Sequence, residues 1–314
     1  MITTAPSRKW YWEKTDPSRS GSSGDLSKLF KNENVKQPGV FSVGAPSADA
    51  TVLAREVIQN SWDAAIELRE DSDDPPPFEI RFSFGSALAE RKGQLMARLG
   101  LDELAERLDG SDVGQLGLHS PNCLEQLSQE GRLPYLLIEE SGTTGMYGPW
   151  SGDRSKMYLA LATVSFHAKR AGTGGSYGYG KSGLIRGSAV RTVVAYTCFR
   201  EREDDPSVTR RLLGMVYWGQ HHRGHESFTG FGRFGHEQDP DAIVPFENEK
   251  ADEIADGLGI PVRDPEFPEQ LGTTFLLIDP IVRPPDLVKA IERSWWPALE
   301  SGGDFHAVVD GGRT

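Results

Sequence analysis

The sequence predicts an α+β fold in which helices and a sheet pack against each other as a sandwich. An amphipathic segment over residues 47–70 is typical of a helix that covers a core. Short apolar runs next to glycine-rich turns, such as 135–140 and 272–279, are typical of buried strands. The segments follow one another as helix, strand, helices, strand, glycine loop and a run of strands. This order does not favour a regular alternation of β and α.

The polar and apolar patterns predict each element along the chain. Residues 1–45 are expected to form a flexible arm, because TDPSRSGSSGD is too polar to build a core, although the aromatic residues of KWYWEK could dock on another surface. The first helix begins after Ser47, a candidate N-cap, and ends before the proline-rich stretch DSDDPPP. A half-buried strand at 78–84 and one or two helices at 87–108 follow. A long irregular region is expected after residue 219. The remaining predictions are strands at 135–140, 191–199, 211–219, 272–279 and 306–310, and helices at 155–169 and 284–299.

The composition limits the class of protein. The 314 residues carry a formal net charge of -12, which argues against tight non-specific binding of nucleic acid by the chain as a whole. Cys123 and Cys198 are the only cysteines and form no C-x-x-C pair, as expected in a reducing compartment. No segment resembles a signal peptide or reaches the length of a membrane span. We therefore expect a cytoplasmic protein without a membrane partner.

Glu56, Asn60 and Asp63 form the first candidate site. Their spacing of i, i+4 and i+7 places them on one stripe of the predicted helix, at the border of its apolar face. Asn60 could offer its oxygen to Mg²⁺, while Glu56 could orient and deprotonate a water molecule. The alternative is a solvated helix face with a chance spacing, because the pattern is common.

The second candidate site is the turn LIEESGTTGM, which follows a predicted strand. Glu140 at the end of this strand could accept a hydrogen bond from an exocyclic amine. Gly142 and Gly145 would let the backbone approach a flat ligand. The alternative is a glycine-rich surface turn.

The third candidate site is the glycine loop GGSYGYGKSG, which fits two phosphate-binding patterns. Gly175, Gly178 and Gly180 match G-x-x-G-x-G, whose backbone N–H groups could wrap phosphates while Lys181 adds a positive charge. Ser182 completes the other pattern, the Walker A sequence G-x-x-x-x-G-K-S.

A P-loop would need a hydrophobic strand immediately before this glycine loop. The preceding residues, SFHAKRAGTG, are polar and broken by glycines, so no strand is expected there. A candidate Walker B strand does exist, FLLID, which ends at Asp279. The P-loop therefore stays open as an alternative, although it leaves the helix motif and the TTG turn unexplained.

Four segments in order, REVIQNSWDA, LLIEESGTTGM, GGSYGYGKSG and GTTFLLI, resemble the nucleotide-binding motifs of the GHKL, or Bergerat-fold, ATPases. That superfamily includes DNA gyrase B subunits, ninety-kilodalton heat-shock chaperones, sensor histidine kinases, MutL and MORC proteins. The resemblance covers residues 47 to 280 and implies a two-layer sandwich, with a mixed, mostly antiparallel sheet covered by helices on one face. Residues 46–314 would form the ATP-binding domain, and a following domain could begin after about residue 300.

The resemblance assigns roles to individual residues. Glu56 would be the general base for the attacking water, Asn60 would hold Mg²⁺, and Asp63 would lie close to the nucleotide. Glu140 stands where the family has an aspartate that reads the adenine amino group, so adenine recognition departs from the family's pattern. Thr273 would support that carboxylate from a neighbouring strand. The other implied nucleotide-binding residues are Gly142, Gly145, Gly175, Gly178, Gly180, Lys181 and Ser182.

The resemblance also carries expectations about the branch and the partners. The TTG variant followed by G-G-S-x-G-x-G-K-S looks more like MORC-related or restriction-associated bacterial ATPases. It implies a slow Mg²⁺-dependent ATPase whose nucleotide state controls homodimerisation or protein partners from the same operon, in DNA processing or anti-phage defence. DNA could be reached through such a partner or through a local basic patch. A nucleotide-sensing interaction module without significant turnover is the alternative.

Overall fold

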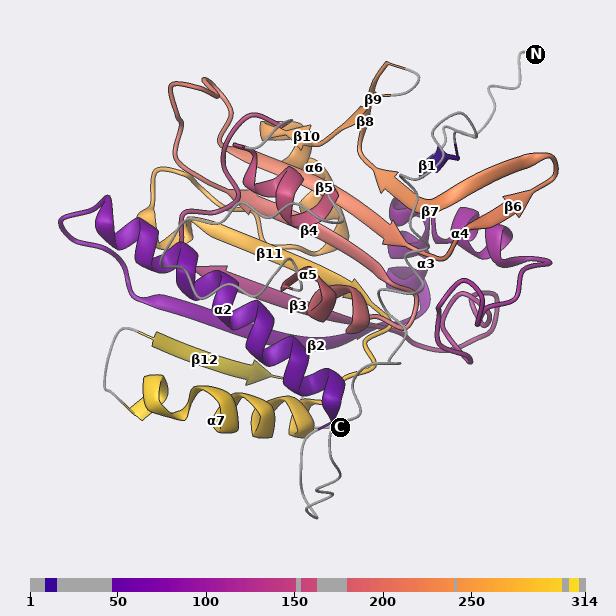
Figure 1. Cartoon of the computed structure of the whole chain (residues 1–314), viewed down its shortest axis with the longest axis horizontal. Helices are drawn as coiled ribbons and strands as arrows, with labels where there is room; N and C mark the ends of the chain where they lie inside the picture. Colours follow the sequence, from indigo (N-terminus) through magenta and orange to yellow (C-terminus); the bar gives the residue numbers. More distant parts are fainter. Residues whose placement is uncertain are drawn as a thin grey trace.

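The fold is that of a computed structural model, which describes residues 9–15, 47–150, 154–162, 180–239, 242–300 and 305–310 (Figure 1). Its strands are β1 (Tyr11–Lys14), β2 (Phe78–Ala87), β3 (Leu133–Ser141), β4 (Thr192–Cys198), β5 (Arg210–Tyr217), β6 (His221–Arg223), β7 (Glu226–Phe234), β8 (His236–Asp239), β9 (Ala242–Val244), β10 (Phe246–Glu247), β11 (Gly272–Ile278) and β12 (Phe305–Asp310). Its helices are α2 (Ala48–Glu70), α3 (Ala89–Leu99), α4 (Leu101–Leu108), α5 (Gly180–Arg186), α6 (Asn248–Leu258) and α7 (Pro284–Glu300), with a π-helix at Tyr158–Ala162 and a 3₁₀ turn at Pro268–Gln270.

One large sheet organises the molecule. Within the described part it is 10-stranded, with the order β1-β7-β5-β4-β11-β3-β2-β12, while β10 pairs with β5 and β6 with β7. β12 runs parallel to β2, and the other strand pairs of this sheet are antiparallel. The predicted α+β class with a mixed, mostly antiparallel sheet is therefore confirmed.

The first helix, α2, begins and ends as predicted. The hydroxyl of Ser47 accepts a hydrogen bond from the Ala50 N–H at 3.2 Å, which caps the helix. The helix ends at Glu70, just before the proline-rich stretch. No helix among the described residues is both long and apolar enough to cross a membrane.

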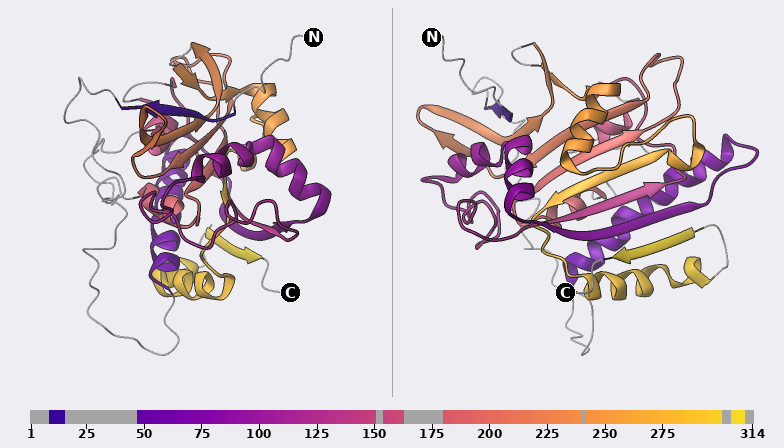
Figure 2. Two further views of the ribbon diagram at one scale, coloured as in Figure 1. Left: turned by 90° about the vertical axis from the view of Figure 1, so that its right-hand side faces the viewer. Right: turned by 180° about the vertical axis from the view of Figure 1, so that it is seen from behind.

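Helices cover both faces of the sheet, so the expectation of helices on one face is wrong (Figure 2). α2, α5 and α7 share one core with Ile138 and Leu277, whereas α3, α4 and α6 share a second core with Tyr196 and Leu276. The physical reason lies in the central strands. Every residue of β4 and β11 is buried, so both faces of these strands have to be covered.

The region after residue 219 is not irregular as expected, because it contains β6 to β10 and α6. β7 shows why the sequence pattern did not indicate strands in this region. Its buried positions include Gly230 and Gly232 as well as phenylalanines. A Cβ at Gly232 would stand 3.2 Å from the Trp12 ring, and one at Gly230 would stand 2.1 Å from the Trp218 carbonyl oxygen. Glycines thus occupy buried positions where the Trp12 ring and the Trp218 backbone already fill the space.

Part of the predicted N-terminal arm belongs to the sheet. β1 pairs with β7 along the sheet edge and buries Trp10 and Trp12. The Trp10 indole N–H donates to the carbonyl of Leu99 at 2.5 Å, which joins β1 to α3. The aromatic residues of this segment therefore dock on the chain's own core.

A buried arginine and histidine lie beneath β1. The guanidinium carbon of Arg107 is 4.3 Å from the ring centroid of Trp12 and 4.4 Å from that of Phe228. Its Nη1 lies 2.9 Å from Nε2 of His221, whose Nδ1 lies 3.0 Å from the carbonyl oxygen of Gly219. Because arginine can only donate, Nε2 accepts and Nδ1 carries the proton, so the imidazole is neutral. Burial lowers the pKa of His221, and the charge of Arg107 lowers it further.

We expect the free energy of unfolding to fall as the pH drops below 6.5, the ordinary pKa of histidine. His221 resists protonation in the fold, so below that pH the unfolded chain binds a proton that the folded chain does not. Urea unfolding of the wild type and of His221→Gln, at about pH 7.5 and about pH 5.5, measures this loss. His222→Gln is the matched control, because His222 is an exposed neighbour. An equal pH dependence in the wild type and His221→Gln would contradict this assignment.

Candidate functional site

α2 carries the residues of the first motif along one stripe. Glu56 and Asp63 are half-buried, and Asn60 between them is exposed. The side-chain amide of Gln59 donates to Oδ1 of Asp63 at 2.8 Å. Burial raises the pKa of Asp63, although this hydrogen bond acts in the opposite direction. The stripe thus presents an exposed carboxamide flanked by two half-buried carboxylates.

α5, the helix that follows the glycine loop, lies against α2 beside Glu56 (Figure 1). A Cβ at Gly183 would stand 3.3 Å from the Cα of Leu53 and 3.5 Å from the Cβ of Glu56. The helices therefore approach closely because glycine has no side chain there. At the other end of α5, Nη2 of Arg186 pairs with Oδ1 of Asp49 at 2.5 Å, at the start of α2.

The described residues include only the end of the glycine loop. Gly180, the last glycine of the G-x-x-G-x-G pattern, is the first residue of α5. Lys181 and Ser182 follow it in the first turn of this helix. Gly175 and Gly178 lie outside the described residues.

The loop after β3 connects the second motif to α2. The backbone N–H of Thr144 donates to the carbonyl of Ala64 in α2 at 3.3 Å, and that of Thr143 donates to the carbonyl of Leu271 at 3.3 Å. The hydroxyl of Thr143 also donates to Oε1 of Glu140 at 3.3 Å. Glu140 is 7% exposed, so this carboxyl group lies in the interior. The loop thereby joins Glu140 to the C-terminal half of α2.

Two buried threonines extend this site across the neighbouring strands. Oγ1 of Thr273 in β11 lies 3.1 Å from Oγ1 of Thr197 in β4. The backbone N–H of Met146, in the loop after β3, donates to the same oxygen of Thr197 at 2.8 Å. By the two-residue period of strands, both threonines and Glu140 lie on the face that α2 covers. The sequence pattern did not predict Thr197, whose only signal is a hydroxyl near the end of a buried strand.

The glycines of the second motif allow the loop to approach its own neighbours. Gly142 and Gly145 have φ values of +70° and +64°. A Cβ at Gly142 would stand 2.3 Å from the carbonyl oxygen of Pro77, and one at Gly145 would stand 2.3 Å from that of Cys198. Their role in this structure is therefore to let the loop lie close to adjacent backbone.

Gly145→Ala is expected to lower the free energy of unfolding by roughly 3 kcal/mol, because a side chain at positive φ would also collide with backbone. Gly93→Ala is the control, since Gly93 lies in α3 and a Cβ there would meet nothing within 4 Å. That change should raise the stability by about 0.5–1 kcal/mol. Urea unfolding of the wild type and both variants measures the free energies of unfolding. A Gly145→Ala variant as stable as the wild type would contradict the close approach at Gly145.

Glu67 extends the polar stripe of α2 by one turn and was not predicted. It forms an ion pair with Lys156 and accepts a hydrogen bond from the hydroxyl of Tyr147. Lys156 also donates to Oγ1 of Thr144 at 3.2 Å. Burial raises the pKa of Glu67, but the hydrogen bonds from Lys156 and Tyr147 outweigh it and the pKa is lowered. Burial lowers the pKa of Lys156. This cluster fixes the loop after β3 to α2.

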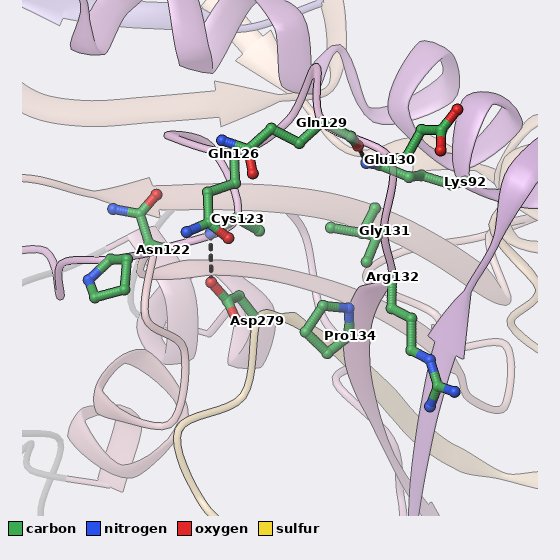
Figure 3. Close-up of a pocket in the computed structure, with 12 residues that line it drawn as sticks. Lys92, Asn122, Cys123, Gln126, Gln129, Glu130, Gly131, Arg132, Pro134 and Asp279 are labelled. Atoms are coloured by element: carbon green, nitrogen blue, oxygen red, sulfur yellow. Dashed lines mark hydrogen bonds between the residues drawn. The ribbon is translucent and has the colours of Figure 1, made fainter.

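Asp279, the candidate Walker B residue, lies at the other end of β11 from Thr273. It lines a pocket of about 250 Å³, and its Oδ2 accepts the backbone N–H of Cys123 at 2.6 Å (Figure 3). Its carbonyl accepts the N–H of Ala189, which follows the C-terminal end of α5. A Walker B aspartate has to reach the metal at the loop that precedes this helix. The geometry therefore argues against a P-loop.

No protein-family model matches the chain, and no curated protein matches it. The resemblance to GHKL ATPases thus depends on the four sequence motifs.

Proposed function

We propose that the chain binds Mg-ATP and hydrolyses it slowly, as expected of a GHKL-type ATPase. One observation carries this proposal: motifs far apart in the sequence meet along α2. Glu56 lies against the helix that follows the glycine loop, and Ala64 is bonded to the loop whose Thr143 contacts Glu140. A chance spacing on a solvated helix face would give no reason for the other motifs to gather there.

The stripe of α2 supplies the groups that phosphate hydrolysis requires. Glu56 is a half-buried carboxylate that can take the proton of an attacking water molecule. Asn60 offers an exposed carboxamide oxygen, and Mg²⁺ prefers oxygen ligands from one or two side chains together with water and the phosphates of a nucleotide. The bound ion would neutralise charge that develops on the phosphate oxygens.

The other end of the site has the chemistry to hold a nucleobase. Glu140 is a buried carboxyl group whose contact with the hydroxyl of Thr143 is long, at 3.3 Å. A carboxylate can accept a hydrogen bond from an exocyclic amine. Thr273 and Thr197 add hydroxyl groups on the same face of the sheet. We propose that glutamate replaces the usual aspartate here as the group that reads adenine.

Calorimetric titration of the whole chain with ATP, in the presence of Mg²⁺ and of EDTA, tests the proposal. We expect binding that strengthens with Mg²⁺ and a slow release of phosphate. Binding of ATP without any release of phosphate would favour the nucleotide-sensing module, and no binding of ATP would contradict both functions.

Three variants separate this proposal from the P-loop alternative. If Lys181→Ala alone abolished binding of ATP, while Glu56→Ala and Asn60→Ala changed nothing, the P-loop alternative would stand instead. Light scattering with and without ATP tests nucleotide-dependent dimerisation.

A further inference from the structure

β12 is an edge strand of the large sheet and lies at its lower border in Figure 1. Among the described residues it pairs only with β2, so one row of its backbone N–H and C=O groups faces no other described strand. Proteins commonly block such an edge with proline, lysine or a β-bulge. β12 has the sequence FHAVVD and pairs with β2 without a shift in register, so it carries none of these. Its backbone can therefore pair with a further strand.

The side chains of β12 alternate between two faces of the sheet. Ala307 and Val309 pack against the core that α2 and α7 share. By the two-residue period of strands, His306, Val308 and Asp310 lie on the opposite face. His306 and Asp310 are exposed, and Val308 between them is half-buried. The edge thus presents a nitrogen donor and a carboxylate at equal distances from a central valine.

This arrangement is complementary to itself. A closed dimer has a two-fold axis, and an isologous interface brings the same strand of both copies together in antiparallel directions. With the axis at Val308, each His306 lies opposite Asp310 of the second copy. On the other face, each Ala307 lies opposite Val309 of the second copy. Apolar pairs and pairs of opposite charge directly across two strands both stabilise a sheet.

The neighbouring strand holds the carboxylate of Asp310 on the face where the second copy would place its histidine. Nη1 of Arg81 in β2 pairs with Oδ2 of Asp310 at 2.7 Å. A carboxylate has two oxygens and accepts several hydrogen bonds, so this pair leaves capacity for an imidazole. His306 stands opposite Glu79 in the register of β2 and β12. An imidazole donates a hydrogen bond in its neutral and in its charged form, so it can serve a carboxylate in either state.

We propose that β12 is a docking surface for a second copy of this chain, which joins the two large sheets edge to edge through antiparallel pairing centred on Val308. The inference goes beyond the proposed function and does not depend on it, because no candidate site residue lies on β12. Interfaces that bury little surface are weak and transient. Because β12 has only 6 residues, we expect a dimer that forms without nucleotide and increases with protein concentration.

A symmetric disulfide tests the register. Opposite residues of an antiparallel pair have Cα atoms about 4.5–5.5 Å apart, which a disulfide can bridge. Oxidised with diamide in the absence of nucleotide, Val308→Cys should give at least about tenfold more disulfide-linked dimer than His306→Cys. His306 is the matched control because it is more exposed on the same face, but its two copies would lie roughly 13 Å apart along the strands. Mass spectrometry of the linked peptides excludes bonds made by Cys123.

A charge series tests the cross-strand pairs. His306→Asp sets two carboxylates opposite each other in both pairs, and like charges directly across two strands destabilise a sheet. We expect this change to weaken self-association by about tenfold or more in sedimentation experiments without nucleotide. His306→Lys keeps a positive group opposite Asp310 and should associate at least as tightly as the wild type. His222→Asp makes the same change on the exposed part of β6 and should have no effect.

Four results would overturn the inference. A wild type that stays monomeric at its highest soluble concentration would mean that no second copy docks on β12. Self-association that His306→Asp leaves unchanged would place the interface on another surface. Equal cross-linking of Val308→Cys and His306→Cys would reflect random collisions, and this pair of variants decides alone if His306→Asp does not fold. Dimers that form only with Mg-ATP would contradict the docking surface and support the nucleotide-controlled dimer of the proposed function, so the two proposals can fail separately.

Discussion

Replacing Glu56 with alanine is expected to slow ATP hydrolysis by about 10²–10⁴-fold and to leave the affinity for Mg-ATP nearly unchanged, because a general base contributes to the transition state. Glu56 lies half-buried in α2, next to the helix that follows the glycine loop. A carboxylate there can take a proton from water beside the phosphates. Single-turnover phosphate release measures the rate, and calorimetric titration measures the affinity.

Arg55→Ala is the matched control for this experiment. Arg55 is exposed on the same helix, one residue before Glu56, and has no assigned role. Its replacement should leave both the rate and the affinity within about twofold, as is usual for surface substitutions. Hydrolysis at the wild-type rate in Glu56→Ala would show that another group activates the water.

Replacing Asn60 with alanine is expected to weaken Mg-ATP binding by about tenfold or more, equivalent to about 1.4 kcal/mol. The exposed carboxamide of Asn60 would be an oxygen ligand of Mg²⁺. Asn60→Asp retains an oxygen donor and should lose less. Calorimetric titrations of the three proteins with Mg-ATP measure the differences.

The same titrations in EDTA provide the control for Asn60. Without Mg²⁺, the wild type and Asn60→Ala should bind ATP with equal affinity, because the missing ligand no longer matters. A loss that persists in EDTA would mean that Asn60 contacts the nucleotide directly. An unchanged affinity with Mg²⁺ would mean that the metal assignment is wrong.

The sequence predicts the elements whose signals are local. Ser47 and the helical period that follows it are sufficient to predict α2, and the short apolar runs VVAY and FLLI are sufficient to predict β4 and β11. β7 was not predicted as a strand because glycines occupy two of its buried positions. The Trp12 ring fills the space at Gly232, and the backbone of Trp218 fills it at Gly230. The second layer of helices follows from the burial of β11 on both faces, which a long apolar run could have indicated.

In the candidate site, too, the sequence predicts the residues of local motifs and not those that tertiary contacts bring in. The stripe of α2 and the turn after β3 are contiguous motifs, so their residues can be named from the sequence. Thr197 and Lys156 enter the site through tertiary contacts, for which no spacing rule exists. Asp279 shows the opposite failure, in which a local pattern predicts a role that the fold does not support. The sequence FLLID fits a Walker B strand, but Asp279 lies near the C-terminal end of α5, away from the glycine loop that precedes this helix.

The connections of α2 also limit how this protein can move. Glu56 and Glu67 stand on one continuous helix, about 16 Å apart at a rise of 1.5 Å per residue. A helix of this kind behaves as a rigid rod, so Glu56, the proposed base, Asn60, the proposed metal ligand, and the contact to the loop after β3 keep fixed separations. If the chain binds ATP as proposed, a movement that leaves α2 intact has to displace α5 or the loop after β3 relative to this helix.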